Sequence, residues 1–321
     1  MRLPKFFTRV MTVICAVALA VAVAGCGGGA NGEKEQFINI ATGGTAGTYY
    51  PIGGAIAEIL NKNGINASAQ STGASVANIN MLKDKQVELA IVQNDITYYA
   101  VNGLEMFKET GKVENLFGIA SLYPETCQFI VREDSGIKSI ADLKDKRVAV
   151  GAAGSGAEAN ARQILEAYGL TYDDVSEQFL SFSEGAIALK DGTVDAAFVT
   201  AGYPTASVQE VASQNKIRIL PVGDDQIKVL SEKYPFYTKT TVPAGTYQNF
   251  DEEVQTVSVM AILVVNDKID AALGEKLTKA IFDNVDKIAA AHAAGKNIKK
   301  ETALEALDFI KMNDGAVKAL K

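Results

Sequence analysis

The stretch 146–165 constrains the fold more than any other part of the chain. It reads KRVAVGAAGSGAEANARQIL, which predicts a short buried strand, a glycine loop and then a helix. Gly151, Gly154 and Gly156 allow a tight turn and let a ligand approach the backbone closely. Ser155 is placed to cap the helix, whose free N–H groups and positive dipole end favour an anion.

An earlier stretch, 38–51, has the same outline. Its sequence INIATGGTAGTYYP predicts a strand, a loop rich in glycine and threonine, and a helix whose first turn suits Pro51. Two such loops in one chain suggest two lobes that grip one small ligand between them.

The predicted elements alternate between strands and helices, and this order indicates an α/β fold. Each lobe would hold a sheet flanked by helices. The predicted strands are 37–41, 65–70, 88–92, 117–123, 127–132, 148–150, 179–182, 194–199, 217–222 and 257–265. The predicted helices include 51–61, 76–82, a short one after a capping box at 139–142, 157–168, 184–190, 269–288 and 302–311, and 239–250 is predicted to be irregular.

The chain is predicted to cross between the two lobes twice. We place one crossing at Pro124 and Glu125, between two strand-like runs, and the return near Val259. Lobe 1 would then comprise residues 37–124 and 259–321, and lobe 2 residues 125–258. Both crossings are expected to act as hinges when the lobes close on a ligand.

The N-terminus has the pattern of a secretory signal. Residues 1–25 combine a positively charged start, an apolar run and small residues. Val23-Ala24-Gly25-Cys26 resembles a bacterial lipobox, which implies that Cys26 carries lipid and that residues 26–36 form a flexible tether. A plain signal peptide, cut elsewhere, is the alternative. Either way the protein is expected outside the cytoplasmic membrane, and the lipobox would anchor it there.

The charge and the titratable residues exclude several classes of function. The net charge is −7, and removal of residues 1–25 would make it −10, which argues against a nucleic-acid partner. His292 is the only histidine, so a Ser-His-Asp site or a multi-histidine metal site is not expected. Cys127 lies in a predicted strand and is interpreted as a small buried residue. We therefore predict no enzymatic activity, no metal and no cofactor.

Several separated motifs, in this order behind a lipobox, resemble the TAXI solute receptors of TRAP transporters. The motifs are ATGGTAGTYYP at 41–51, QSTGAS at 70–75, QND at 93–95, GAAGSGAE at 151–158 and VPAGTY at 242–247. The resemblance implies a two-lobe periplasmic-binding-protein fold of type II, with the ligand cleft between the lobes. It also implies a monomer that captures a small carboxylate, such as glutamate or a related organic acid, for uptake by a TRAP-type membrane permease.

The resemblance also implies which residues bind the ligand. Hydroxyl and backbone N–H groups can solvate a carboxylate without a full counter-charge. The positions that match the family's cleft are Thr45, Gly47, Thr48, Tyr49, Ser71, Gly73, Ser75, Gln93, Asp95, Ser155, Gly156, Thr200 and Tyr203.

Two other functions are compatible with parts of the sequence. A nucleotide-binding enzyme would use the loop after residue 150, but its spacing is G-x-x-G-x-G rather than G-x-G-x-x-G, and no Gly-Lys-Ser/Thr phosphate loop occurs. A solute-binding protein that serves an ABC importer, a sensor kinase or no transporter would have the same cleft. The ligand itself is not identified by the sequence.

Overall fold

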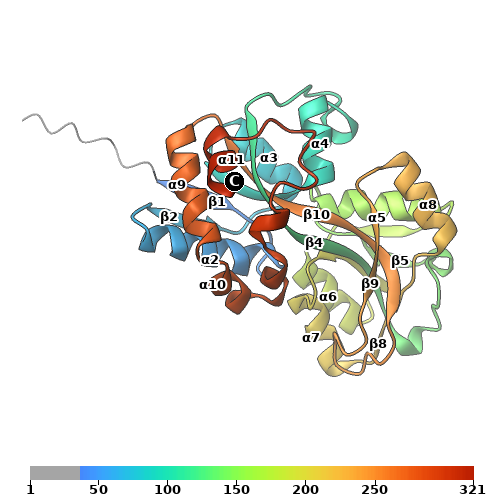
Figure 1. Ribbon diagram of the computed structural model, residues 1–321. Helices are drawn as coiled ribbons and strands as arrows, with labels where there is room; N and C mark the ends of the chain where they lie inside the picture. The colour runs from blue at the N-terminus through green and yellow to red at the C-terminus, as the bar shows by residue number, and fades with distance from the viewer. Residues whose placement is uncertain (1–36) are drawn as a thin grey trace, which may run out of the picture. The chain divides into compact units, whose positions relative to one another are not determined.

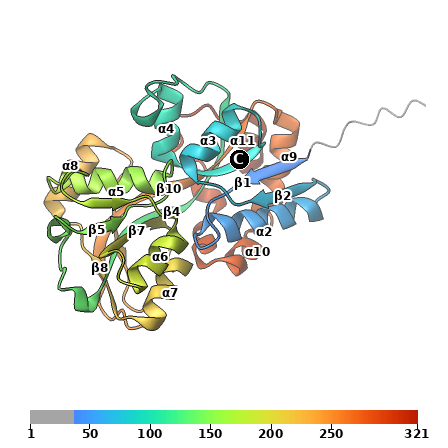
Figure 2. The same ribbon diagram turned by 180° about the vertical axis from the view of Figure 1, so that it is seen from behind.

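The computed structural model describes residues 37–321 as one twisted sheet with helices on both of its faces (Figures 1 and 2). The predicted signal peptide, the tether and Cys26 lie outside the described residues. Within the described part, no helix has the length and apolar character needed to cross a membrane. The α/β fold with two lobes is confirmed.

The first part of the chain forms three parallel strands, with β1 between the other two. Its elements are β1 (Ile38–Ala41), α2 (Tyr49–Lys62), β2 (Ala67–Gln70), α3 (Ser75–Lys83), β3 (Leu89–Gln93), α4 (Asn94–Asn102) and the 3-10 turn η1 (Glu105–Phe107). In α2 the predicted apolar side, Ile52, Ile56, Ile59 and Leu60, is buried. Each strand therefore ends near the start of a helix, which places the loops between them at one edge of the sheet.

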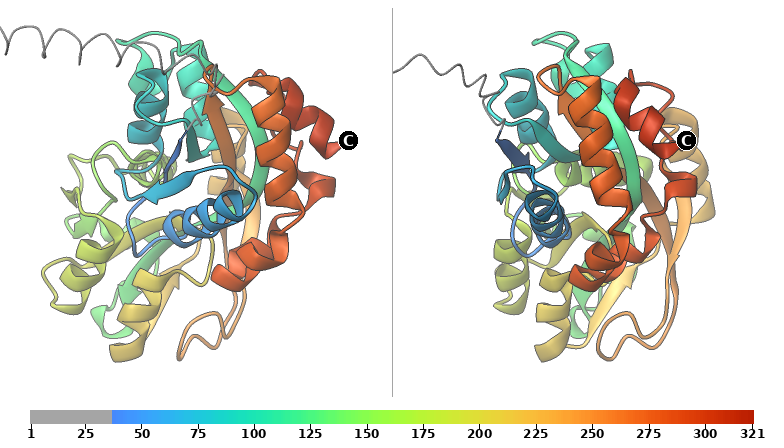
Figure 3. Two further views of the ribbon diagram at one scale, coloured as in Figure 1. Left: turned by 90° about the vertical axis from the view of Figure 1, so that its left-hand side faces the viewer. Right: turned by 60° about the vertical axis from the view of Figure 1, so that its left-hand side comes forward.

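Two long antiparallel strands, β4 (Leu116–Arg132) and β10 (Val254–Asn266), form the middle of the sheet (Figure 3). β10 pairs with β3 on its other side, and β4 pairs with β7 and β8. The two strand-like runs predicted on either side of Pro124 and Glu125 form one continuous strand, β4, and the lobe crossing placed there stays a prediction. Pro124 is opposite Met260 in the pairing of β4 with β10, and the register shifts two residues earlier, where Leu122 has no partner between Ala261 and Ile262.

The middle of the chain adds the strands β5 to β9 and their helices. The elements are η2 (Glu133–Ser135), η3 (Ile140–Leu143), β5 (Arg147–Ala149), α5 (Gly156–Ala167), β6 (Ser176–Gln178), α6 (Phe182–Lys190), β7 (Ala196–Ala201), α7 (Ala206–Gln214), β8 (Ile217–Leu220), α8 (Asp224–Lys233) and β9 (Thr238–Val242). The capping box predicted at 139–142 is present, and so is the predicted cap of α5 by Ser155.

Two predictions for this part are wrong. The strand predicted at 179–182 is an irregular segment that leads into α6 at Phe182, because Ser181 and Glu184 form a capping box there. The segment predicted to be irregular, 239–250, begins with β9, which pairs with β10. The helices α7 and α8 had no counterpart among the predicted elements.

The C-terminal region differs most from the prediction. The helix predicted at 269–288 is two helices, α9 (Ala271–Phe282) and α10 (Val285–Ala291), although its apolar stripe is largely buried. The helix predicted at 302–311 is wrong. Residues near 311 pair with Gly118 of β4 instead, through hydrogen bonds from Gly118 N to Lys311 O (2.9 Å) and from Asn313 N to Gly118 O (3.0 Å). The remaining elements are η4 (Ala293–Asn297), η5 (Lys300–Thr302) and α11 (Asp314–Leu320).

Candidate functional site

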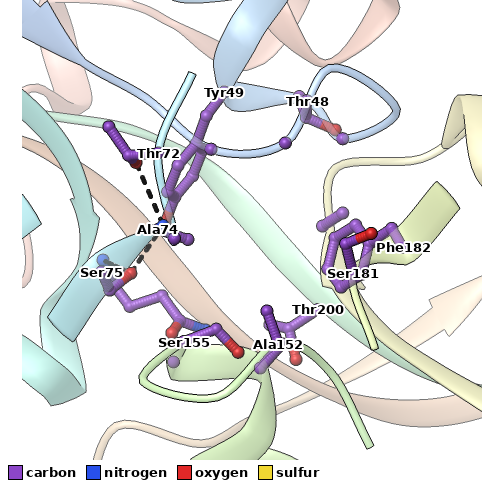
Figure 4. Close-up of a pocket in the computed structure, with 18 of the residues that line it drawn as sticks. Thr48, Tyr49, Thr72, Ala74, Ser75, Ala152, Ser155, Ser181, Phe182 and Thr200 are labelled. Carbon is purple, nitrogen blue, oxygen red and sulfur yellow. Dashed lines mark hydrogen bonds between the residues drawn. The ribbon is translucent and has the colours of Figure 1, made fainter. Parts of the chain in front are cut away.

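One cavity brings together loops from both lobes (Figure 4). Its volume is about 80 Å³. A single water needs about 10–15 Å³, so the cavity has room for a small organic molecule. Tyr49 and Ser75 lie on one side of it, and Ser181 and Phe182 lie opposite.

Most of the residues predicted to bind a ligand line this cavity. They come from the ends of strands and the starts of helices in both parts of the chain. They are Gly47, Thr48, Tyr49, Gly73, Ser75, Gln93, Ser155, Gly156 and Thr200.

Four predicted residues do not line the cavity. Thr45 is exposed, and the hydroxyl of Ser71, also an exposed residue, donates to the backbone oxygen of Gly43 (3.0 Å). Asp95 is buried in the first turn of α4. The hydroxyl of Tyr203 is directed to the backbone oxygen of Thr241 (3.4 Å).

The sequence reasoning did not identify several lining residues. Among them are Thr72, Glu125, Ser181 and Phe182. The capping-box pattern at Ser181 was a signal for a helix start and could have pointed to the cavity. Glu125 was noticed only as a crossing point, because nothing in the local sequence shows that β4 passes beneath the cavity.

Four helices begin at the cavity: α2, α3, α5 and α6. The first N–H groups of a helix and its dipole together favour an anion. Neither α2 nor α3 has a side-chain cap. In contrast, Ser155 Oγ accepts from Glu158 N (3.1 Å), and Ser181 Oγ accepts from Glu184 N (3.3 Å). The N-termini of α2 and α3 therefore offer uncapped donors to a bound group.

The two serine caps differ in their remaining hydrogen-bonding capacity. The hydroxyl of Ser181 also donates to Glu184 Oε2 (2.6 Å), so its proton is already used. The hydroxyl of Ser155 makes no second hydrogen bond with the described residues, and its side chain lines the cavity. Ser155 can therefore donate to a ligand while it caps α5.

Polar side chains connect the two lobes beside the cavity. Gln93 Nε2 donates to Asn160 Oδ1 (2.7 Å), and Asn160 Nδ2 donates to Asp95 Oδ2 (2.8 Å) and to the hydroxyl oxygen of Tyr237 (2.8 Å). These side chains are buried. Burial raises the pKa of Asp95 to about 6, although the hydrogen bond from Asn160 lowers it. Asp95 thus holds the contact between α4 and α5 together rather than facing the cavity.

A second contact joins the first loop to the end of β7. The hydroxyl of Thr48 donates to the backbone oxygen of Gly202 (2.8 Å), and Ser207 N donates to Ala46 O (3.2 Å). With the lobe boundaries predicted from the sequence, each of these contacts joins a residue of lobe 1 to a residue of lobe 2. The structure therefore has the lobes in contact around the cavity.

The other singled-out residues do not line the cavity, although Cys127 Sγ contacts the hydroxyl of Thr200 (3.6 Å). His292 ends α10, and its Nδ1 accepts from Ala294 N (3.1 Å); burial lowers its pKa. Cys127 is buried in β4, as predicted, and burial raises the pKa of its thiol. Arg162 pairs with glutamates on and beside α5. Within residues 37–321, no three His, Cys, Asp or Glu side chains are grouped so that they could hold a metal ion.

The comparisons with known proteins agree with this architecture. A model of the NMT1-like family matches residues 40–321. The solved structure of PhnD1 from Prochlorococcus marinus, in complex with methylphosphonate, is 11% identical, with 83% of this chain and 92% of that chain covered and a TM-score of 0.55. A structure from Bordetella bronchiseptica RB50 is 17% identical, with 88% and 96% covered and a TM-score of 0.55. These likenesses are similarities of fold.

Proposed function

Because the chain belongs to the NMT1-like family and has the two-lobe fold of periplasmic binding proteins, we propose that it is an extracytoplasmic solute-binding protein for a small acid. The observation that carries the proposal is the cavity between the lobes, at which four helices begin. PhnD1 was solved with methylphosphonate, a small anion, and we extend only this class of ligand to the chain.

In this role the protein binds its solute and releases it unchanged. The acid group of the ligand would accept hydrogen bonds from the uncapped N-termini of α2 and α3 and from the hydroxyl of Ser155. A carboxylate such as glutamate, another organic acid, and a small phosphonate or sulfonate all fit this description. The cavity has no lysine, arginine or histidine among its described lining residues, so backbone dipoles would supply most of the attraction.

For the membrane partner we favour an ABC importer over a TRAP permease. The matching family model is described as NMT1-like and not as TAXI, so the TAXI resemblance has no support from it. Uptake by intact cells distinguishes the two transporters, because ATP drives an ABC importer and an ion gradient typically drives a TRAP permease. Uptake that stops with vanadate and survives collapse of the ion gradients would support the ABC importer, and the reverse result would support TRAP.

The solute-binding function is tested by a thermal-shift screen of amino acids, keto acids, dicarboxylates, phosphonates and sulfonates. A ligand that binds only the folded state raises the melting temperature. At a ligand concentration of a hundred times its Kd, the free energy of unfolding increases by about 2.7 kcal/mol. Calorimetry on each hit then gives the affinity and shows whether the solute is unchanged. If no acid in the screen binds, or if a bound acid is converted, the proposal is wrong.

A further inference from the structure

Glu125 places an acid inside the proposed anion cavity. It lies in β4, and its side chain lines the cavity although the residue is only 2% exposed. The hydroxyl of Tyr49 donates to Glu125 Oε2 (2.7 Å). The other oxygen, Oε1, makes no hydrogen bond with any described residue. One carboxyl oxygen is therefore held in place, and the other is left for a ligand.

Among residues 37–321, no positively charged side chain lies beside Glu125 to compensate its charge. The described lining residues include no basic side chain, and the ionisable groups that act on Glu125 are Tyr49 and the acid Asp95. Burial raises the pKa of Glu125 well above its usual range, and the charge of Asp95 raises it further. Glu125 therefore holds its proton more tightly than a free glutamic acid does, and a cation beside its carboxyl group would stabilise the ionised form.

The same cavity also has a region that favours negative charge. The N-termini of α2, α3 and α5 supply N–H donors from Tyr49, Ser75 and Gly156 onwards. Thus one region favours an anion, and Glu125 favours a hydrogen-bond partner that is positively charged. With a volume of about 80 Å³, the cavity can present both poles to a single small molecule.

We infer that the ligand is a small zwitterion, whose protonated amine lies against Glu125 and whose acid group lies at the helix N-termini. This inference rests on the proposed solute-binding function and narrows the ligand class to amino acids and their phosphonate or sulfonate analogues. An anion without an amine would leave Glu125 neutral and Oε1 without a charged partner. When the ammonium group binds, the carboxyl proton of Glu125 leaves to solvent and the carboxylate pairs with the ammonium group.

Pairs of ligands that differ only in the amine test the inference. We would measure the affinities of L-glutamate and glutarate, L-aspartate and succinate, and L-alanine and propionate by calorimetry at pH 7. At least one amino acid should bind ten- to a hundredfold more tightly than its deaminated counterpart, the range expected for a hydrogen bond to a charged group. Equal or tighter binding of the deaminated acids would overturn the inference and leave the proposed function intact. No binding by any small acid would overturn both.

Glu125→Gln tests the residue itself. Glutamine can still accept the hydrogen bond from Tyr49 but cannot ionise, so the amino acid should lose ten- to a hundredfold in affinity while its deaminated counterpart is unaffected. Glu88→Gln is the matched control, because Glu88 is also buried but accepts from Asn39 N (3.0 Å) outside the cavity. It should leave the preference for the amine unchanged.

Proton release provides a readout that does not depend on a variant. Calorimetry of the amino acid in two buffers of different ionisation enthalpy should show release of a proton by the wild-type protein. Binding without proton release would contradict the inference, and so would an unchanged amine preference in a folded Glu125→Gln protein.

Discussion

Gly156 and Gln93 are in direct contact across the two lobes. A Cβ atom built on Gly156 would lie 1.3 Å from Oε1 of Gln93 and 2.9 Å from Cγ1 of Ile96. Gln93 cannot easily move aside, because its Nε2 donates to Asn160 (2.7 Å). The absence of a side chain at residue 156 therefore lets the start of α5 meet the end of β3.

Gly156→Ala is expected to separate these two elements. Overpacking in a closely packed region typically costs about 1–3 kcal/mol. We expect a loss of that size in the free energy of unfolding, together with weaker ligand binding, measured by urea denaturation and calorimetry. Gly54→Ala in α2 is the control, because its Cβ would meet nothing within 4 Å and a helical alanine is favourable. Equal stability of Gly156→Ala and wild type would show that the contact is not tight.

Ser155 and Ser181 offer a matched comparison of two helix caps at one cavity. Loss of either cap should cost about 1 kcal/mol of stability. Only Ser155→Ala should also weaken ligand binding, by about ten- to a hundredfold, because only Ser155 has a hydroxyl proton free to donate. Melting curves and calorimetry on both variants measure the two effects. Ser68→Ala, outside the cavity in β2, should leave the affinity unchanged. If Ser155→Ala binds as well as wild type, Ser155 is only a cap.

The pKa of Asp95 predicts how stability depends on pH. A folded-state pKa of about 6, above the usual 3.8, means that folded Asp95 holds its proton where the unfolded chain has lost it. The stabilisation of the fold by protonated Asp95 is complete below about pH 4 and is lost as the pH rises through 6. A difference of one pKa unit corresponds to about 1.4 kcal/mol in the free energy of unfolding.

Asp95→Asn removes this dependence. The amide keeps the shape of the protonated side chain and an acceptor for Asn160 Nδ2. Urea denaturation from pH 4 to pH 8 should show the variant gaining about 3 kcal/mol relative to wild type over that range. The surface acids titrate in both proteins and cancel in the difference, which reports Asp95 together with the effect of its charge on the pKa of Glu125. A constant difference across the range would show that Asp95 is ionised in the fold.

Thr48 is expected to favour the closed arrangement of the lobes. Thr48→Val removes the hydrogen bond to Gly202 O and should raise the open fraction, since the bond joins the two lobes. Small-angle scattering should show ligand-dependent compaction in wild type and a larger radius for the empty variant. Thr193→Val is the control, because Thr193 bonds to Ala188 O (3.1 Å) within lobe 2. Identical scattering with and without saturating ligand would argue against hinge motion.

The lipid anchor is a separate prediction. Cys26 should carry lipid after removal of residues 1–25, and Cys26→Ser should release the protein from membranes or block maturation. Cell fractionation and mass spectrometry of the mature protein provide the measurement. An unmodified Cys26 at an internal position of the mature chain would exclude the anchor.

The features that the sequence predicted well depend on residues close together in the chain. The cap at Ser155 joins residues three positions apart, and the apolar side of α2 repeats within a few turns. Most of the residues predicted at the C-terminal ends of β-strands also line the cavity, because parallel strands bring those ends to one edge.

The features that the sequence did not predict depend on distant partners. β4 is continuous because β10 pairs along it, and β10 lies far away in the chain. The helix predicted at 302–311 is replaced by pairing with Gly118, which is equally distant. Glu125 reaches the cavity only because β4 passes there, so no local pattern could identify it. Asp95 has the expected loop position, but the contact between α4 and α5 covers it.

The shared strands β4 and β10 have a consequence for the order in which the chain can fold. Neither lobe contains all of its own sheet until residues 254–266 are available, because β10 pairs with β3 in one lobe and with β9 in the other. A chain that lacks residues 254–321 therefore cannot complete the sheet of lobe 1. The two lobes should consequently form together, as a single cooperative unit, rather than one after the other.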